Sequence, residues 1–439
     1  MHPETTPENH ILALADRCVK CGLCLPQCPT YNLTFNESES PRGRIALIQA
    51  VVNKQLNADA QLLHHLDTCL LCQRCERVCP SGVEYGKLMD NARALLHTHS
   101  PTSRIKKMGL DLLQHPKRLR LLGAVLYLYQ KSRIGNLLNY IPVVRKSRLV
   151  QLQKLLPKTT TVSRLQNYYP AIGDRRGQLV LFAGCMGEAA DNLTLSSSIQ
   201  LLTRLGYDIH LPEQQTCCGA MHQHSGESTQ ALSMALQNIH AVNIIQTKAI
   251  VYTSSGCGAQ LKNYTRLNWC SETEQQQAHH FSNKVMDVSE FLAAELSTYK
   301  DWHKQLAFAP LDKHVVIHQP CSQRNVLRLP NHTATLLEQI PGIKLYNLPD
   351  NTSCCGAAGD YMLRHPRQAQ SLRSHLLNKI TEHPVEIIAT SNLGCALFLN
   401  AGVKNNKIEL MHPVTLLANQ LTQFQGTSDE NNFIISYHK

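Results

Sequence analysis

The feature that most constrains this chain is a cysteine run that occurs twice near its start. Each run reads C-x2-C-x2-C-x3-C and is followed by a proline, at Pro29 and Pro80. This spacing is typical of chains that hold two [4Fe-4S] cubes, in which three cysteines of one run bind one cube and the fourth binds the other. The sequence therefore predicts two cubes that fold the runs against each other. On this rule the first cube is bound by Cys18, Cys21, Cys24 and Cys79, and the second by Cys69, Cys72, Cys75 and Cys28.

Two other kinds of site use closely spaced cysteines. Zinc sites pair C-x2-C motifs that are set well apart, whereas here four cysteines fall within each short run. Disulfide frameworks belong to exported chains, and residues 1–10 contain neither the basic nor the apolar segment of an export signal. We therefore expect the cysteines to bind metal in a reducing cytoplasm. The longest apolar run, Leu121–Tyr129, is far shorter than the roughly 20 residues of a membrane span.

Between the two runs the sequence predicts a turn at 40–44 and then a helix over 45–52, and a second helix is predicted over 88–97. Arg42 and Arg44 belong to the turn. Positive charge or hydrogen-bond donors close to a cube would raise its reduction potential. The alternative is that both arginines are solvated at the start of the helix.

Residues 104–158 account for the whole formal net charge of +11, since they contain thirteen lysines and arginines and a single acid, Asp111. Leucines at three- and four-residue spacing predict short amphipathic helices, which Pro116, Pro142 and Pro157 interrupt. Such a segment could rest on anionic lipid or dock a partner; the alternative is a helical connector with a solvated basic face. It lacks the interleaved aromatic residues of a stacking surface, so we expect no nucleic acid as a partner.

The second half of the chain contains an internal repeat. In each copy an apolar strand ends at a cysteine, a Cys-Cys-Gly-Ala motif follows, and another apolar strand ends just before a last cysteine. The two copies are offset by a nearly constant number of residues, which indicates a duplication. The alternation of strands and helices predicts an α/β unit with a parallel sheet. The candidate metal ligands are Cys185, Cys217, Cys218 and Cys257 in the first copy, and Cys321, Cys354, Cys355 and Cys395 in the second.

These repeat cysteines follow the carboxyl ends of strands, where ligands gather in open α/β sheets, so each set of four should converge. The glycine after each Cys-Cys pair should let the loop bend until both thiols face the site. Cys270 falls outside both patterns and is expected to be free and partly buried. His222, His224 and His318 are candidates for supporting the metal ligands or moving protons, or for plain packing.

Two nucleotide-binding motifs are absent from the sequence. Neither G-x-G-x-x-G nor G-x-x-x-x-G-K-[ST] occurs, so the sequence gives no support for a flavin, a nicotinamide or a nucleotide on this chain. No catalytic residues for organic chemistry are predicted.

With these features the chain resembles the iron-sulfur subunit of bacterial glycolate oxidase over nearly its whole length. The repeats are also similar to the cysteine-rich CCG domains of heterodisulfide reductase subunits, lactate-utilisation proteins and anaerobic glycerol-3-phosphate dehydrogenase. In the fullest CCG pattern each repeat ends in C-x-x-C, but here Gln260 and Phe398 stand in place of the last cysteine. The resemblance rests on the paired runs, the turn at 41–45, the spacings C-x31-C-C-x38-C and C-x32-C-C-x39-C, and Gly359, Tyr361, His365 and Pro366.

The resemblance implies an electron-transfer subunit of a flavin-dependent 2-hydroxy-acid dehydrogenase complex that oxidises glycolate to glyoxylate. FAD would lie on partner subunits, and this chain would pass electrons to a quinone or another acceptor. The resemblance fits a cytoplasmic protein with peripheral contact to the inner membrane. A D-lactate or glycerol-3-phosphate dehydrogenase subunit, a heterodisulfide-reductase-like thiol enzyme, and a binding module with degenerate repeats are the alternatives.

The expected fold class is α+β with several domains. Residues 1–100 would form a helical ferredoxin-type domain with two [4Fe-4S] clusters, and 101–175 a basic helical connector. Residues 176–300 and 301–439 would form the two α/β CCG repeats, each with its own iron-sulfur centre.

Overall fold

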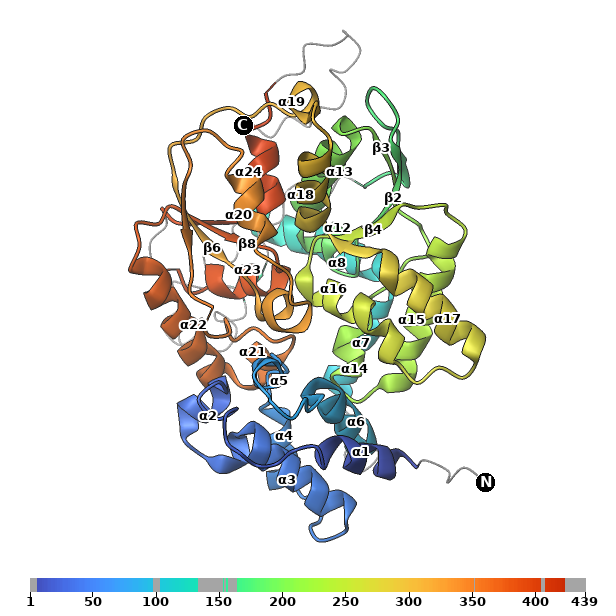
Figure 1. Cartoon of the computed structure of the whole chain (residues 1–439), viewed down its shortest axis with the longest axis vertical. Coiled ribbons are helices and arrows are strands. Elements are labelled where there is room, and N and C mark those ends of the chain that lie inside the picture. The colour runs from blue at the N-terminus through green and yellow to red at the C-terminus, as the bar shows by residue number, and fades with distance from the viewer. Residues whose placement is uncertain are drawn as a thin grey trace.

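The computed structural model describes residues 6–97, 103–132, 153, 155–156, 164–350, 352–403 and 407–422. A helical N-terminal unit lies at one end of the molecule, in blue in Figure 1, and two α/β repeats lie beside each other above it. The first repeat is green to yellow and the second is orange to red. This architecture confirms the predicted fold class.

The N-terminal unit is made of short helices around an apolar core that includes Ile45, Leu88 and Met89. The helix after the predicted turn begins earlier than expected, because Pro41 takes the first helical position and the Ser40 hydroxyl accepts a hydrogen bond from Gly43 N at 2.9 Å. The helices are α1 (Pro7–Ala15), α2 (Pro29–Thr34), η1 (Glu37–Glu39), α3 (Pro41–Val52), α4 (Ala60–Asp67), α5 (Arg74–Arg77) and α6 (Tyr85–His97).

The connector contains two described helices, α7 (Arg104–Gln114) and α8 (Pro116–Lys131). Pro116 begins α8 at the position where a missing N–H costs no helical hydrogen bond. One side of α8 packs on the short helix α12 (Gly187–Ala190) of the first repeat. Pro142 and Pro157, and the leucines at 149 and 152, lie outside the described residues.

The first repeat is a five-stranded sheet in the order β1-β3-β2-β4-β5. All neighbouring strands are parallel except β1, which pairs with β3 in the antiparallel direction. The central strands are apolar runs buried on both faces, as a parallel sheet covered by helices requires. Its strands are β1 (Tyr168–Tyr169), β2 (Gly177–Phe182), β3 (Tyr207–His210), β4 (Ala249–Tyr252) and β5 (Val285–Asp287), and its further helices are α13 (Asn192–Arg204), α14 (Ala220–Gln223), α15 (Ser228–Asn243), α16 (Ser255–Lys262), η2 (Asn263–Arg266), α17 (Glu272–Lys284), α18 (Val288–Thr298) and α19 (Trp302–Gln305).

The second repeat is a four-stranded parallel sheet in the order β7-β6-β8-β9. It has the predicted alternation of strands and helices, and its strand order matches the β3-β2-β4-β5 part of the first sheet. Its strands are β6 (His314–His318), β7 (Lys344–Asn347), β8 (Ile387–Thr390) and β9 (Glu409–Met411), and its helices are η3 (Ser322–Val326), α20 (His332–Leu337), α21 (Tyr361–Arg364), α22 (Pro366–Thr381), α23 (Leu393–Asn400) and α24 (Pro413–Asn419).

The two repeats share one hydrophobic core, which contains Leu179 and Val251 of the first sheet together with Val315 and Ile387 of the second. Helices α13 and α18 of the first repeat form one side of this core, and α20 and α24 of the second form the other. Helix α13 packs on α24, and α18 packs on α20. The repeats are therefore joined by buried apolar surface.

The N-terminal unit is fixed to both repeats by side chains that hydrogen-bond to backbone carbonyl groups. The Arg93 guanidinium of α6 donates to Cys69 O at 3.0 Å and, on the first repeat, to His224 O at 3.0 Å. On the second repeat, the Asn325 amide donates to Cys72 O at 2.9 Å. Arg93 and Asn325 both donate to carbonyl groups of the second cysteine run, at Cys69 and Cys72. This run therefore lies where the N-terminal unit meets the two repeats.

Candidate iron-sulfur sites

The second cysteine run and the last cysteine of the first run line one cavity, which we call the second-run site. Cys28, Cys69, Cys72 and Cys75 all line it, and Tyr85 Oη lies 3.8 Å from Cys69 Sγ on the same wall. These are the four cysteines that the spacing rule assigns to the second cube. Four thiols around one cavity fit a [4Fe-4S] cube, which takes four cysteine ligands.

A cube differs from a single metal ion in the spacing of its ligands. Among the described residues, no three Cys, His, Asp or Glu side chains converge on a position for one ion. A cube instead takes one thiolate at each of four iron atoms, so its ligands surround a volume and do not meet at a point. The lining of the cavity therefore offers the four cysteines that a cube needs.

Both runs contain residues in the left-handed backbone conformation, at matching positions, and these residues make the chain coil. In the first run Lys20 and Gly22 have φ angles of 56° and 85°, and in the second Leu71 and Gln73 have φ angles of 50° and 52°. In each run these residues flank the second cysteine. Three of the four are not glycine, so the conformation is unfavourable for them and the surrounding structure must hold it. The coil lets three successive cysteines of one run face the same space.

The cysteines predicted for the first cube belong to the same helical unit. Cys18, Cys24 and Cys79 contact its apolar core, and Cys21 is exposed. Cys79 of the second run and Cys18 and Cys24 of the first run thus pack against the same apolar core. The set of four ligands stays a prediction.

Of the two arginines in the predicted turn, Arg42 lies beside the first run. Its Nη1 donates to Lys20 O at 3.2 Å, and its Nε donates to Glu37 Oε1 at 2.7 Å. A Cβ atom at Gly22 would lie 2.9 Å from the same Nη1. Arg42 therefore braces the loop that carries the first three cysteines.

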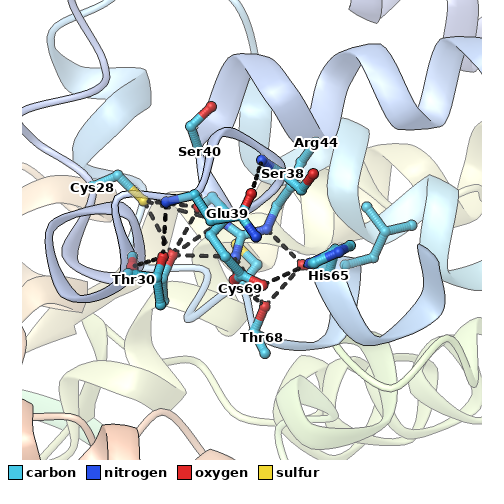
Figure 2. A network of polar contacts seen from close by, with 12 residues as sticks. Cys28, Thr30, Ser38, Glu39, Ser40, Arg44, His65, Thr68 and Cys69 are labelled. Carbon is cyan, nitrogen blue, oxygen red and sulfur yellow. Dashed lines mark hydrogen bonds and ion pairs between the residues drawn. The ribbon is translucent and has the colours of Figure 1, made fainter. Parts of the chain in front are cut away.

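Arg44 lies beside the second site and is buried, with 1 % of its surface exposed. Its Nη1 is 4.0 Å from Cys28 Sγ, and its Nη2 forms an ion pair with Glu39 Oε2 at 2.7 Å. Figure 2 shows this pair within a network of polar contacts around Cys28. The alternative of a solvated arginine at a helix start is wrong for Arg44.

Three further residues complete the network, and nothing in the sequence pattern singled them out. Both Nη atoms of Arg44 donate to Thr30 Oγ1 at 3.1 Å, and Nη2 also donates to Thr68 Oγ1 at 3.1 Å. The Thr68 hydroxyl donates in turn to Glu39 Oε2. His65 Nδ1 lies 2.7 Å from Glu39 Oε1. The buried ion pair thus has most of its hydrogen-bonding capacity satisfied, as burial of two charges demands.

Burial changes the proton affinity of the groups at the second site. It raises the pKa of the Cys72 and Cys75 thiols well above the usual range, so both keep their protons at neutral pH unless a metal displaces them. Burial is the largest effect and lowers the pKa of Arg44, but electrostatic interactions with its neighbours, among them the ion-paired carboxylate of Glu39, outweigh burial and raise the pKa overall. Arg44 therefore stays a cation beside the cavity.

In the second repeat the four candidate cysteines are grouped. Cys321 Sγ lies 4.0 Å from Cys354 Sγ, and the Cys355 thiol donates to Cys395 Sγ at 2.8 Å. Gly356 has a φ of 87° and its N–H donates to Cys354 Sγ at 3.4 Å. The left-handed glycine is what turns the adjacent cysteines toward one site, as predicted.

The first repeat has the same arrangement. Hydrogen bonds from Cys185 and Cys218 lower the pKa of Cys217, and the Cys218 thiol is hydrogen-bonded to Cys257 in addition. Gly219 has a φ of 86° and donates to Cys217 Sγ at 3.5 Å. Each repeat therefore offers four thiols, which is a sufficient donor set for one iron-sulfur centre. Which centre they bind stays a prediction.

The second-run site borders the site of the second repeat. Leu70 and Cys72 pack in the same cluster as Cys354, Cys355 and Cys395. Cys72 also interacts electrostatically with Cys321. Burial is the main cause of the raised pKa of Cys72, and this interaction raises it further. No such contact was deducible from the sequence, because the two segments are far apart along the chain.

The three candidate histidines have different surroundings. His222 is fully buried, and its Nε2 lies 2.9 Å from the Gln114 amide nitrogen while its Nδ1 has no partner in the described part of the chain. His224 Nδ1 binds Asp90 of α6 at 2.9 Å, so it joins the first repeat to the N-terminal unit. His318 is hydrogen-bonded to Thr390 at 2.9 Å, and burial lowers its pKa to about 3. His318 is therefore neutral.

Cys270 is exposed, so the prediction of a partly buried thiol is wrong. It lies just before Ser271, which caps the mostly polar helix α17, and this end of the helix faces solvent. At the ends of the CCG motifs, Gln260 and Phe398 are both buried, with 3 % and 2 % of their surface exposed. Phe398 fills its position with apolar packing in the second repeat.

Family models match all four parts of the chain. Residues 14–83 match the 4Fe-4S dicluster domain, residues 179–262 and 315–400 each match the cysteine-rich domain CCG, and residues 101–156 match the linker region of the glycolate oxidase iron-sulfur subunit. Together with the fold and the grouped thiols, these matches define a dicluster iron-sulfur protein with two CCG repeats.

Comparison with whole proteins identifies the family within this class. The chain is 32 % identical over 417 residues to the probable glycolate oxidase iron-sulfur subunit of Bacillus subtilis, covering 91 % of this chain and 92 % of the relative. It is 31 % identical over 390 residues to the glycolate oxidase iron-sulfur subunit of Escherichia coli, covering 87 % and 89 %. Lactate utilization protein A 2 of Bacillus cereus is 24 % identical over 246 residues, or 55 % of this chain. The chain belongs to the glycolate oxidase iron-sulfur subunit family.

Proposed function

We propose that this chain is the iron-sulfur electron-transfer subunit of a complex that oxidises glycolate to glyoxylate. Membership of the family supports this role, since the relatives from B. subtilis and E. coli are named as glycolate oxidase subunits. The two cubes would be held by the ligand sets of the spacing rule, in a domain of residues 1–100. The repeats would hold further iron-sulfur centres through their four thiols each.

What supports an electron path most directly is the contact between the second-run site and the second repeat. Cys72 packs in one cluster with Cys354 and Cys355, and Asn325 fixes the Cys72 backbone to the repeat. The cubes supply one-electron redox chemistry when bound. The buried residues Leu70, Cys354 and Cys355 belong to this cluster of side chains, so the two thiol sites are packed against each other. Electrons would thus enter at the N-terminal unit and leave through a repeat.

The flavin that accepts the substrate's hydride would lie on partner subunits, and the final acceptor would be a quinone or another carrier. The test is anaerobic affinity purification of the tagged chain from its native cells. We expect an FAD-containing protein to co-purify, and the complex to reduce an artificial acceptor with glycolate faster than with D-lactate or glycerol-3-phosphate. A pull-down without a flavoprotein would contradict the proposed role, and a preference for lactate would change the substrate only.

We also propose that the complex rests on the cytoplasmic face of the inner membrane. Among the described residues, no helix has the length and apolarity needed to cross a bilayer. Helix α8 nevertheless exposes Leu121, Val125 and Leu128, which share one face at helical spacing, with 68 %, 55 % and 64 % of their surfaces accessible. Arg118 and Lys131 flank them. An apolar stripe between cations suits the surface of a bilayer that contains anionic lipid.

The double substitution Leu121→Ser/Val125→Ser should weaken this contact, because it removes apolar side chains and leaves every charge in place. We expect the fraction of protein that floats with phosphatidylglycerol-containing vesicles to fall at least about fivefold. Ile244→Ser is the matched control, since Ile244 is 80 % exposed at the end of α15 on the first repeat. Equal flotation of the double variant and the control would rule out α8 as the contact.

A further inference from the structure

A polar cavity of about 110 Å³ lies in the second repeat, at the carboxyl ends of β6 and β7. His318 at the end of β6 and Asn347 at the end of β7 both line it, together with Arg324 of η3 and with Asn331 and Thr352 from the following segments. The carboxyl edge of a parallel sheet is where open α/β folds bind their ligands. Nothing in the role proposed above uses this cavity.

Arg324 is the charged group on its wall and is only partly satisfied. It is 7 % exposed, its Nη2 donates to Thr352 O at 2.6 Å, and its Nε is buried without a hydrogen-bond partner. The acid on the lining, Asp350, is 86 % exposed and lies 4.0 Å from Arg77 of the N-terminal unit. In the part of the chain that the structure describes, Arg324 forms no ion pair with a carboxylate, although an uncompensated buried charge is costly.

At the matching position of the first repeat, the charged residue has an ion-pair partner within the protein. Arg324 lies three residues after Cys321, and the residue three after Cys185 is Glu188. Helix α8 of the connector packs over this position, and Arg120 of α8 pairs with Glu188 at 3.4 Å. In the first repeat a cation from the connector meets an acid, whereas in the second the residue at this position is itself a buried cation. Cys321, Cys354 and the exposed Asp350 interact with it electrostatically, but none of the described carboxylates forms an ion pair with it.

We propose that the cavity of the second repeat binds a small carboxylate anion, with Arg324 as its charged partner and with Asn331 and Asn347, which also line the cavity, as uncharged polar partners. A guanidinium matches the two oxygens of a carboxylate. The volume is several times the roughly 30 Å³ that one water occupies in the liquid, so it admits an anion of only a few heavy atoms. Ile317 and Leu348 are the apolar residues on the lining, which is too little apolar surface for a quinone and its tail.

The test is calorimetric titration of the full-length chain, purified without oxygen and with its iron content measured. The probes are acetate, glycolate, glyoxylate and inorganic phosphate, each against chloride of equal ionic strength. Glycolate and glyoxylate are chosen because of the proposed function, whereas acetate binding does not depend on it. We expect saturable binding of the carboxylates at one site, and at least tenfold weaker binding by Arg324→Gln. Arg328→Gln, which changes an exposed arginine four residues further on, should bind like the unaltered chain.

A second variant keeps the proposal testable if Arg324→Gln lowers the iron content. Asn347→Leu changes an exposed residue on the lining of the cavity and should also weaken carboxylate binding. The proposal is overturned if the unaltered chain shows no saturable carboxylate binding, or if Asn347→Leu and an iron-replete Arg324→Gln both bind as tightly as it does. Tighter binding of phosphate than of every carboxylate would overturn the class of ligand.

Discussion

Replacement of Cys72 by alanine is expected to stop electron transfer from glycolate to the final acceptor while flavin reduction in the same complex continues. Cys72 is one of four thiols around the second-run cavity, and a cube needs all four cysteine ligands. It also packs against the cysteines of the second repeat. We expect reduction of the distal acceptor to fall by at least about a hundredfold. Alanine is chosen because a serine oxygen could still bind iron.

Two stopped-flow measurements on the purified complex check this expectation. One follows the bleaching of the flavin by glycolate, and the other follows the distal acceptor. Cys270→Ala is the matched control, because Cys270 is exposed and lies outside every grouped set of thiols. If Cys72→Ala slows flavin reduction as much as acceptor reduction in an assembled complex, the second-run site is not a relay between the two.

The second large effect is expected from Arg44→Met, which removes the cation beside Cys28. The loss of one partner from a buried ion pair leaves Glu39 uncompensated and should cost about 3–5 kcal/mol of stability. The midpoint of thermal unfolding should therefore fall. The reduction potential of the centre at Cys28 should also fall, by roughly 50–100 mV, since a unit charge several ångströms away is lost at an effective dielectric constant of about 20.

A double variant separates these two effects. Arg44→Met/Glu39→Gln removes both charges, so much of the stability should return because no unpaired charge stays buried. If Arg44 only holds the fold, the potential measured by an EPR-monitored redox titration should return to that of the unaltered protein whenever stability does. If Arg44 tunes the centre through its hydrogen bond and charge at Cys28, part of the fall in potential should persist in the more stable double variant.

The elements that the sequence predicts well are those imposed by covalent geometry. Cysteines that bind one cube must follow one another at short fixed spacing, so the runs around Cys21 and Cys72 were recognisable without a structure. Parallel strands buried on both faces must be apolar throughout, so strands such as β2 and β8 stood out as well. Duplication then made each repeat support the assignment of the other.

Contacts between segments that are far apart along the chain left no comparable pattern in the sequence. Arg44 was a candidate by its position near the runs, but its partners Glu39 and His65 became visible only when α3 and α4 were placed. The bond from Asn325 to the Cys72 carbonyl joins residues of different units. In the connector the structure leaves basic residues such as Arg118 exposed, but it also exposes leucines such as Leu121, which the sequence did not reveal because burial depends on which side of a helix meets a neighbour.

The pairing of helices between the repeats has an evolutionary consequence. Helix α13, between β2 and β3, packs on α24, which follows β9, and α20, between β6 and β7, packs on α18, which follows β5. Equivalent helices thus exchange partners, which is the isologous pattern of a two-fold symmetric homodimer. In a homodimer every substitution appears twice. Two copies in one chain are free of that restriction, so matching positions can differ, as Glu188 and Arg324 do. One half could then receive the connector helix, while the other kept an open cavity beside its thiols.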